Sequence, residues 1–219
     1  MSLQLFAHPF SSYSQKALIA LYENEIPFTF RMLSPAEPEN GAEFAARWPL
    51  KRFPILVDGD RTIFEATSII EYLDAHYPGR VRLIPADADL AIDVRMMDRV
   101  FDNYVMGMMQ KPVLDAIRAP EVRDAHGVAE ARAMLDTAYA WLDGLMANRE
   151  WAVGDGFTLA DCAAAPALFY ADWVHPIPTG YANLSGYRQR LLARPSFARA
   201  INEARPYRAF FPLGAPGRD

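Results

Sequence analysis

The stretch from residue 53 to residue 64 reads Phe-Pro-Ile-Leu-Val-Asp-Gly-Asp-Arg-Thr-Ile-Phe. Two runs of β-forming side chains flank Asp58-Gly59, an arrangement typical of a tight β-hairpin. Pro54 stands directly before the first run, and because proline has no N–H to give to a β-ladder, it belongs at the start or the edge of a strand. The stretch therefore predicts a hairpin whose first strand starts next to Pro54.

Upstream of the hairpin, residues 3–7 and 28–32 have the character of strands. Apolar side chains recur at helical spacing over residues 14–24 between them. A β-α-β unit of this kind implies a parallel strand pair with a right-handed crossover.

A loop marked by Pro35, Pro38 and Gly41 and a short helix at residues 43–48 are expected between this unit and the hairpin. Apolar residues on one face of residues 67–76 predict a helix after it. The predicted order of the first part of the chain is β-α-β-α-β-β-α.

From residue 87 onward the hydrophobic pattern is helical throughout. Helices are predicted at residues 87–109, 122–147, 158–173, 186–193 and 195–204, with proline or glycine breaks at Pro112, Pro120, Gly154, Pro176 and Pro178. Thr158 and Asp161 have the spacing of a capping box, which indicates a role in folding. We therefore expect a mixed α/β domain over residues 1–79, a linker over 80–86 and an all-helical domain over 87–219.

The composition excludes several classes of function. The 219 residues are 52% hydrophobic and carry a formal net charge of −5, which argues against nucleic acid as a partner. No run of about 18 apolar residues suggests a membrane span. The single cysteine, Cys162, leaves no intrachain disulfide and no cysteine-rich metal cluster, so a cytoplasmic protein without a metal is expected.

Three segments resemble the glutathione transferase family in their order and spacing. Residues 48–56 resemble the family's approach to its cis-proline, residues 64–73 resemble its Glu-Ser-x-Ala-Ile-x-x-Tyr-Leu motif, and residues 158–161 resemble its Ser/Thr-x-x-Asp capping box. The resemblance covers nearly the whole chain up to Pro206. It implies a thioredoxin-like N-terminal domain that binds glutathione and an all-helical C-terminal domain.

The resemblance also assigns residues around Pro54. It implies a cis bond between Phe53 and Pro54 that turns the main chain of Phe53 toward the glutathione backbone. Arg52 or Lys51 then stands where the family often binds the glycyl carboxylate, although a solvated basic pair is the alternative interpretation of these two residues.

The other end of glutathione is expected at residues 65–67. The unpaired N–H groups of a helix start favour a carboxylate, and Glu65 can accept the ligand's ammonium group; the alternative is that Glu65 only complements the helix dipole. The family's serine after this glutamate is Ala66 here, so one hydrogen bond to the ligand is lost unless the hydroxyl of Thr67 replaces it.

A glutathione enzyme must stabilise the thiolate, because a free thiol with a pKa of about 8.5 is mostly protonated at neutral pH. The turn before the first helix resembles the Ser-x-x-x-x-Arg/Lys start of the serine-type classes (phi, tau and zeta-like). Aligned on Lys16, this resemblance makes Ser11 the catalytic serine. Ser12 and Tyr13 remain alternatives, and N-capping is the alternative role of these serines, Ser14 included.

The second domain is expected to supply a pocket for an apolar electrophile. The family resemblance points to the methionine-rich helix and a later one, with core packing as the alternative for each side chain. The expected pocket residues are Phe10, Phe101, Tyr104, Met108 and Tyr170 or Trp173.

These observations together predict a cytoplasmic glutathione transferase of the bacterial type that acts in detoxification. Glutathione is its co-substrate, a small hydrophobic electrophile its second substrate, and the resemblance implies a homodimer. Isomerase, dehalogenase and peroxidase activities remain open. A rival hypothesis is an interaction or regulatory protein of the same fold without turnover, which the Ala66 departure favours.

Overall fold

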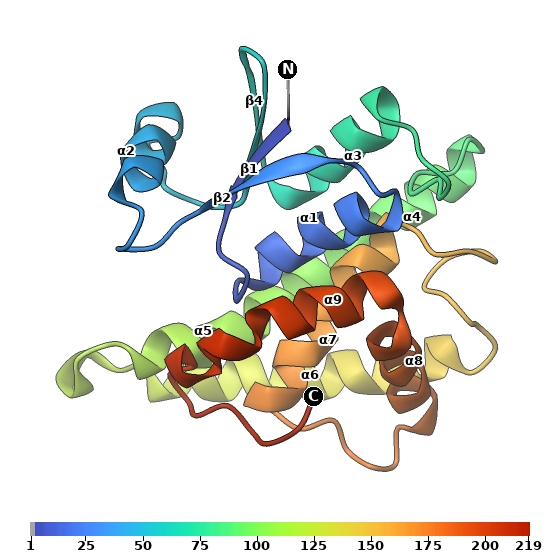
Figure 1. The fold of residues 1–219 in the computed structure, drawn as a ribbon. Coiled ribbons are helices and arrows are strands. Elements are labelled where there is room, and N and C mark those ends of the chain that lie inside the picture. Colours follow the sequence, from blue (N-terminus) through green and yellow to red (C-terminus); the bar gives the residue numbers. More distant parts are fainter. Residues whose placement is uncertain (1–2) are drawn as a thin grey trace.

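A four-stranded mixed sheet forms the first part of the chain, of which the computed structural model describes residues 3–219 (Figure 1). β1 pairs in parallel with β2 and antiparallel with β3, and β3 pairs antiparallel with β4, so the strand order is β2-β1-β3-β4. Gly59, with φ of 58°, makes the hairpin turn. The strands are β1 Leu3–Ala7, β2 Phe28–Met32, β3 Ile55–Asp58 and β4 Arg61–Phe64.

Helices cover both faces of the sheet. α1 (Ser12–Glu23) and α3 (Ala66–His76) lie on one face and α2 (Pro38–Arg47) lies on the other (Figure 1). Because side chains alternate along a strand, Leu56 of β3 faces the large core beneath α1 and α3, whereas Ile55 packs with Phe44 of α2. The thioredoxin-like order β-α-β-α-β-β-α is confirmed.

The predicted loop is confirmed at Pro35, which lies in a turn, but it ends earlier than expected. Pro38 is not part of a loop but the first residue of α2, where a missing N–H costs nothing and the fixed φ of proline suits the helix. Glu39 in the first turn complements the helix dipole. The helix therefore includes Gly41 and ends at Arg47.

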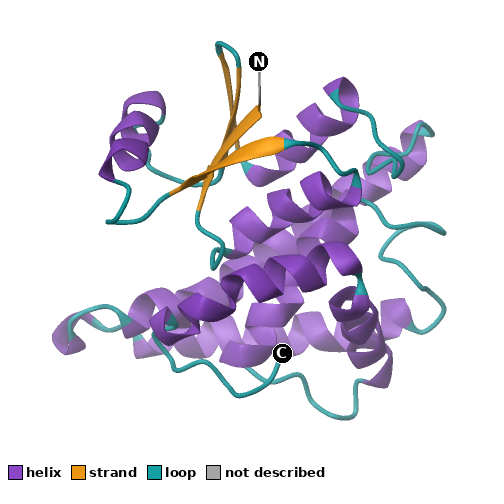
Figure 2. Cartoon of the chain, in the orientation of Figure 1, coloured by secondary structure: helices purple, strands orange, loops and turns teal. Residues whose placement is uncertain are grey.

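In the rest of the described chain the regular elements are all helices, which Figure 2 shows in purple, joined by loops in teal. A π-helical segment separates α4 from α5 without an intervening loop, and two short 3-10 helices lie at Pro120–Val122 and Arg205–Phe210. The longer elements are α4 Ala88–Val100, the π-helix Phe101–Met106, α5 Gly107–Ala116, α6 Ala125–Met146, α7 Leu159–Val174, α8 Ala182–Ala193 and α9 Pro195–Ala204. No helix among the described residues is both long and apolar enough to cross a membrane.

The predicted break at Pro112 does not occur, because α5 continues through it to Ala116. A proline inside a helix removes one backbone hydrogen bond, and the buried ring of Pro112 packs in this helix while the neighbouring turns persist.

Two helices join the sheet to the helical part. α1 packs against α7 and α9 as well as against the sheet and α3, so nearly all of its residues are buried (Figure 1). Every residue of α7 is buried, and the capping box of Thr158 and Asp161 begins this helix as predicted. Asp161 also accepts hydrogen bonds from Ala152 N at 2.9 Å and Tyr187 Oη at 2.6 Å. A single hydrophobic core therefore extends from β1 to Phe211.

Candidate functional site

A cavity of about 450 Å³ lies where the sheet-bearing part of the chain meets α4 and α5. Its walls carry charged and polar side chains, and we call it the polar cavity. It is lined by Ser11, Tyr13, Lys51, Arg52, Phe53, Pro54, Glu65, Ala66, Arg99, Asp102, Asn103, Gln110 and Leu114.

A smaller cavity of about 200 Å³ adjoins it, and we call it the apolar cavity. Its lining is mostly aromatic and aliphatic: Phe10, Ser11, Ser12, Met109, Gln110, Val113, Tyr170, Phe210, Phe211 and Pro212. Ser11 and Gln110 are the two residues that line both cavities. A polar compartment and an apolar compartment therefore meet at these two side chains.

The Phe53–Pro54 peptide bond is cis, and Pro54 is buried in the wall of the polar cavity. The ladder between β1 and β3 ends at Ile55. Within the described chain, the backbone N–H and C=O of Phe53 make no hydrogen bond. These groups are free to pair with an extended ligand, as strand addition requires. Lys51 and Arg52 beside them are exposed.

The start of α3 forms the opposite end of the polar cavity. Glu65 precedes the helix with φ of 64°, a conformation that costs a non-glycine residue about 1 to 3 kcal/mol and that occurs often at ligand sites. No described side chain caps α3, whose first backbone bond runs from Ile69 N to Glu65 O at 2.9 Å. The N–H groups of residues 66–68 therefore open toward the cavity end of the helix.

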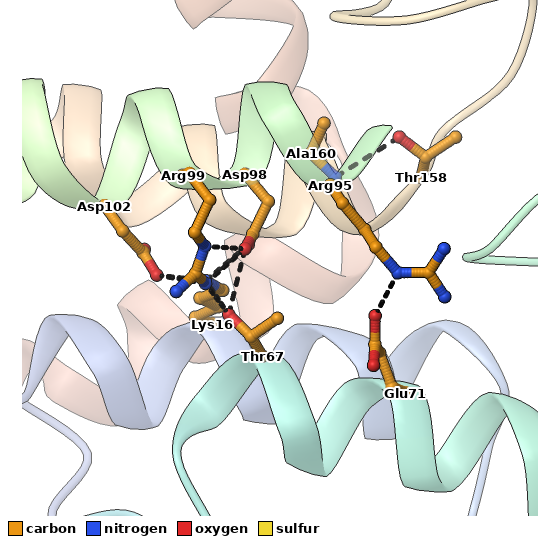
Figure 3. A network of polar contacts seen from close by, with 9 residues as sticks. All are labelled: Lys16, Thr67, Glu71, Arg95, Asp98, Arg99, Asp102, Thr158 and Ala160. Carbon is orange, nitrogen blue, oxygen red and sulfur yellow. Dashed lines mark hydrogen bonds and ion pairs between the residues drawn. The ribbon is translucent and has the colours of Figure 1, made fainter. Parts of the chain in front are cut away.

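Thr67 belongs to a network of polar contacts between α1, α3 and α4 (Figure 3). Its hydroxyl accepts a hydrogen bond from Lys16 Nζ at 2.9 Å and another from Arg99, and it donates to Asp98 Oδ2 at 3.0 Å. It does not line the polar cavity. The expectation that Thr67 replaces the missing serine is not met, because its hydroxyl is already engaged.

Lys16 is the centre of this network and is fully buried. Its Nζ lies 2.5 Å from Asp98 Oδ1 and 2.7 Å from Asp102 Oδ2, and Arg99 pairs with both carboxylates from the solvent side. Burial raises the pKa of Asp102, while the charge of Lys16 opposes that rise. Two cations thus balance two carboxylates in the interface.

Asp102 also faces the polar cavity. Its Oδ2 pairs with Lys16 and Arg99, but its buried Oδ1 has no hydrogen-bond partner among the described residues. A buried carboxylate oxygen without a donor is costly, so the cations Lys16 and Arg99 beside this carboxylate offset that cost through its other oxygen.

The turn before α1 carries the four competing hydroxyls. Ser11 is the N-cap of α1, and its Oγ accepts a hydrogen bond from Ser14 N at 3.3 Å. Ser12 lines only the apolar cavity, Tyr13 lines only the polar cavity, and Ser14 is fully buried. Burial, reinforced by Asp102 and Glu65, raises the pKa of Tyr13 to about 12.

Two buried side chains hold this turn in place. Gln15 Nε2 donates to Pro9 O and to Tyr170 Oη, each at 3.0 Å, and Tyr170 Oη donates to Phe10 O at 3.1 Å. His8 Nδ1 accepts a hydrogen bond from Phe10 N at 3.2 Å, so His8 shapes the turn as well.

The structure brings together only some of the residues expected to form the electrophile pocket. Phe10 and Tyr170 line the apolar cavity. Phe101 is fully buried in the core, Tyr104 is half-exposed, and Met108 lines neither cavity. Trp173 packs against Phe211 of the C-terminal tail instead, with 5.3 Å between ring centroids.

The π-helical segment explains this shift. Gly107 N bonds to Asp102 O, five residues back, whereas an α-helix bonds four residues back. The additional residue in this turn rotates the following side chains, so the helix presents Met109, Gln110 and Val113 to the apolar cavity. The candidates Phe101, Tyr104 and Met108 follow α-helical spacing, and they therefore do not line the apolar cavity.

The sequence analysis did not predict the polar network around Lys16. One signal was present, since Asp98 and Asp102 lie four residues apart and would repel each other on one helix face unless a cation lay between them. A lysine beside the apolar run Ala17–Leu21 of α1 was the complementary signal.

The fold combines a thioredoxin-like sheet with an all-helical second part, and a cavity lies between Pro54 and the start of α3. Comparison with known families gives a match to the N-terminal domain of glutathione S-transferases over residues 5–81 and to their C-terminal domain over residues 104–195. The chain belongs to the glutathione S-transferase family.

Individual relatives are distant but match over nearly their full length. Glutathione S-transferase GstB of Escherichia coli strain K12 is 28% identical over 202 residues, which cover 87% of this chain and 93% of GstB. A probable maleylacetoacetate isomerase of Vibrio cholerae is 27% identical over 214 residues, or 94% of this chain and 98% of that protein.

The crystal structure of a glutathione S-transferase from Methylobacillus flagellatus KT with GSH bound has a similar fold. It superimposes with a TM-score of 0.82 at 25% identity and covers 91% of this chain and 98% of its own.

We predict that Thr67→Val destabilises the fold by about 1 to 3 kcal/mol, because it leaves the buried partners of the hydroxyl without one hydrogen bond each. Urea unfolding measures the difference. Ser68→Ala, an exposed substitution in the same helical turn, is the control and should change stability by less than about 0.5 kcal/mol. Equal effects of the two substitutions would show that the hydrogen bonds of Thr67 contribute nothing to the free energy of unfolding.

Proposed function

We propose that the protein is a glutathione transferase that joins the thiolate of glutathione to a small apolar electrophile in the course of detoxification. The observation that carries the proposal is the meeting of the polar and apolar cavities at Ser11. Glutathione bound in the polar cavity places its sulfur at this junction, and the electrophile occupies the apolar cavity. The family membership and the relative with bound GSH support this arrangement.

The charges of the polar cavity suit the ends of glutathione, which carries two carboxylates and one ammonium group at neutral pH. Arg52 or Lys51 pairs with the glycyl carboxylate at one end. At the other end, the exposed carboxylate of Glu65 accepts the ammonium group. The backbone of Phe53 pairs with the cysteinyl part between them.

The glutamyl carboxylate then meets the start of α3. The N–H groups at Ala66 and the two residues after it supply hydrogen bonds and the positive end of the helix dipole. Ala66 offers no hydroxyl, and that of Thr67 is engaged elsewhere. Binding at this end therefore depends on backbone donors and on the paired charges of the ammonium group.

Ser11 is the proposed catalytic residue. Its oxygen accepts the N–H of Ser14, which leaves the hydroxyl proton free to donate to the thiolate. The start of α1 adds the positive end of a second helix dipole beside the sulfur. In the reaction the thiol loses its proton to solvent, and Ser11 stabilises the thiolate without itself transferring a proton. As the sulfur forms its bond to the electrophilic carbon, either a leaving group departs with its electron pair or the π electrons of a double bond move onto the electrophile.

We also propose a homodimer. Exposed apolar side chains gather on α4 and α6, where Met96 and Trp141, each about half-exposed, line a common cavity of about 600 Å³. Exposed apolar side chains bordered by charged residues, here Asp93 and Arg149 among others, are typical of protein interfaces. Sedimentation equilibrium should give about twice the chain mass of 24.6 kDa, and a Trp141→Glu variant should shift the mass toward the monomer; a wild-type monomer would refute the dimer.

The direct test of the proposed function is retention on immobilised glutathione followed by a conjugation assay with a simple aryl halide. The wild-type protein should be retained, elute with free glutathione and turn over the halide. Ala66→Ser, which adds a hydroxyl beside a bound carboxylate, should bind glutathione about tenfold more tightly. A protein that is neither retained nor active would favour the non-catalytic alternative.

A second test concerns the activating hydroxyl. Ser11→Ala should raise the apparent pKa of the bound thiol and lower the conjugation rate at neutral pH about tenfold for each unit of that rise. Tyr13→Phe should leave both unchanged, because the Tyr13 hydroxyl lies outside the junction. The pH dependence of conjugation measures both.

Loss of the helix cap must be separated from loss of the donor. Ser11→Gly provides the comparison, since glycine at an N-cap costs helix stability only a few tenths of a kcal/mol; it should reproduce the kinetic defect of Ser11→Ala. The opposite result, a defect in Tyr13→Phe alone, would reassign the activator to Tyr13.

A further inference from the structure

Gln110 of α5 shares with Ser11 the position between the two cavities. On the proposed function, this is the place where the sulfur of glutathione and the reacting carbon of the electrophile meet. Gln110 comes from the helical part of the chain and Ser11 from the turn after β1, so the reacting atoms are approached from two sides.

The amide of Gln110 is not used by the fold. It makes no hydrogen bond with any described residue, and its side chain is only partly exposed. The other large polar side chain of the apolar cavity, Tyr170, has its hydroxyl occupied by Gln15 and by the carbonyl of Phe10. Ser12 is buried and touches only the apolar cavity. Gln110 therefore brings a free N–H donor to the junction.

Addition of a thiolate to a carbonyl-activated alkene creates a negative charge that such a donor can stabilise. When a thiolate adds to an α,β-unsaturated carbonyl compound, a bond forms between sulfur and the β-carbon, and the π electrons move to the carbonyl oxygen as an enolate. A proton from water then reaches the α-carbon, and no group leaves. The developing charge on oxygen needs a donor, because the surrounding wall is apolar.

An alkyl halide places different demands on the same site. The carbon–halogen bond breaks as the sulfur–carbon bond forms, and the negative charge departs with the halide. No oxygen gains charge, so a single amide donor at the junction has much less to stabilise.

We propose that Gln110 donates a hydrogen bond to the electrophile's oxygen and directs the enzyme toward small electrophiles activated by a carbonyl group. The inference rests on the proposed transferase function and adds the substrate class to it. The volume of the apolar cavity, about 200 Å³, is below the range of about 300 to 1,000 Å³ common for drug-sized ligands, which favours small substrates.

The experiment compares two electrophiles of similar size with the wild-type protein and Gln110→Leu. Benzylideneacetone carries a carbonyl group next to its reactive alkene, and benzyl chloride carries no oxygen. Gln110→Leu should lower kcat/KM for benzylideneacetone about ten- to a hundredfold, the range between a neutral hydrogen bond and an oxyanion-hole donor. It should change kcat/KM for benzyl chloride less than about threefold.

Gln189→Leu, the same substitution on α8 away from both cavities, should alter neither reaction. Gln110→Glu, which at neutral pH offers no donor, should lose activity on benzylideneacetone at least as strongly as Gln110→Leu. Equal losses on both electrophiles, or no loss on either, would overturn the role of Gln110 while the transferase function stands. A wild-type protein that conjugates neither electrophile would overturn both.

Discussion

The ammonium group of Lys16 lies in the interface between the sheet-bearing part and the helical part, between the carboxylates of Asp98 and Asp102. A charge moved out of water loses its hydration, so each of these groups can be buried only because the others are present. Replacing such a group by well-packed apolar residues is often neutral or stabilising, whereas removing one partner costs several kcal/mol. What the network contributes is therefore the placement of α1, α3 and α4 relative to one another.

Each wall of the polar cavity depends on that placement. α1 continues from the turn that carries Ser11, α3 opens at Ala66, and α4 leads into the π-helical segment that carries Asp102. A displacement of α4 would move Asp102 away from the start of α3. The same helix continues into α5, so the position of Gln110 at the junction is set from the same network. The shape of the polar cavity therefore depends on the same polar contacts that hold the interface together.

The features of the fold that could be predicted from sequence are those that depend on short patterns of neighbouring residues. The Asp58-Gly59 turn, Pro54 before a strand and the Thr158 capping box each report on a few neighbouring residues, and each was placed correctly. α2 was missed at its start because Pro38 can either end a loop or begin a helix, and the surrounding packing of Phe44 decides between them. The residues that α5 presents to the apolar cavity were not predicted, because their direction depends on a π-helical turn that no local sequence pattern indicated.

Two residues of the candidate site, each considered alone, argue against the proposed function. Ala66 lacks the hydroxyl that the family places beside the glutamyl carboxylate, and Ser11 already serves as a helix cap. A hydroxyl has one proton and two lone pairs, so accepting a bond from Ser14 still leaves Ser11 its donor for a thiolate. At the other end, the backbone donors of α3 do not depend on the side chain at position 66. In the complex that we propose, substitution at this position therefore changes the strength of glutathione binding and keeps the geometry that presents the sulfur to Ser11.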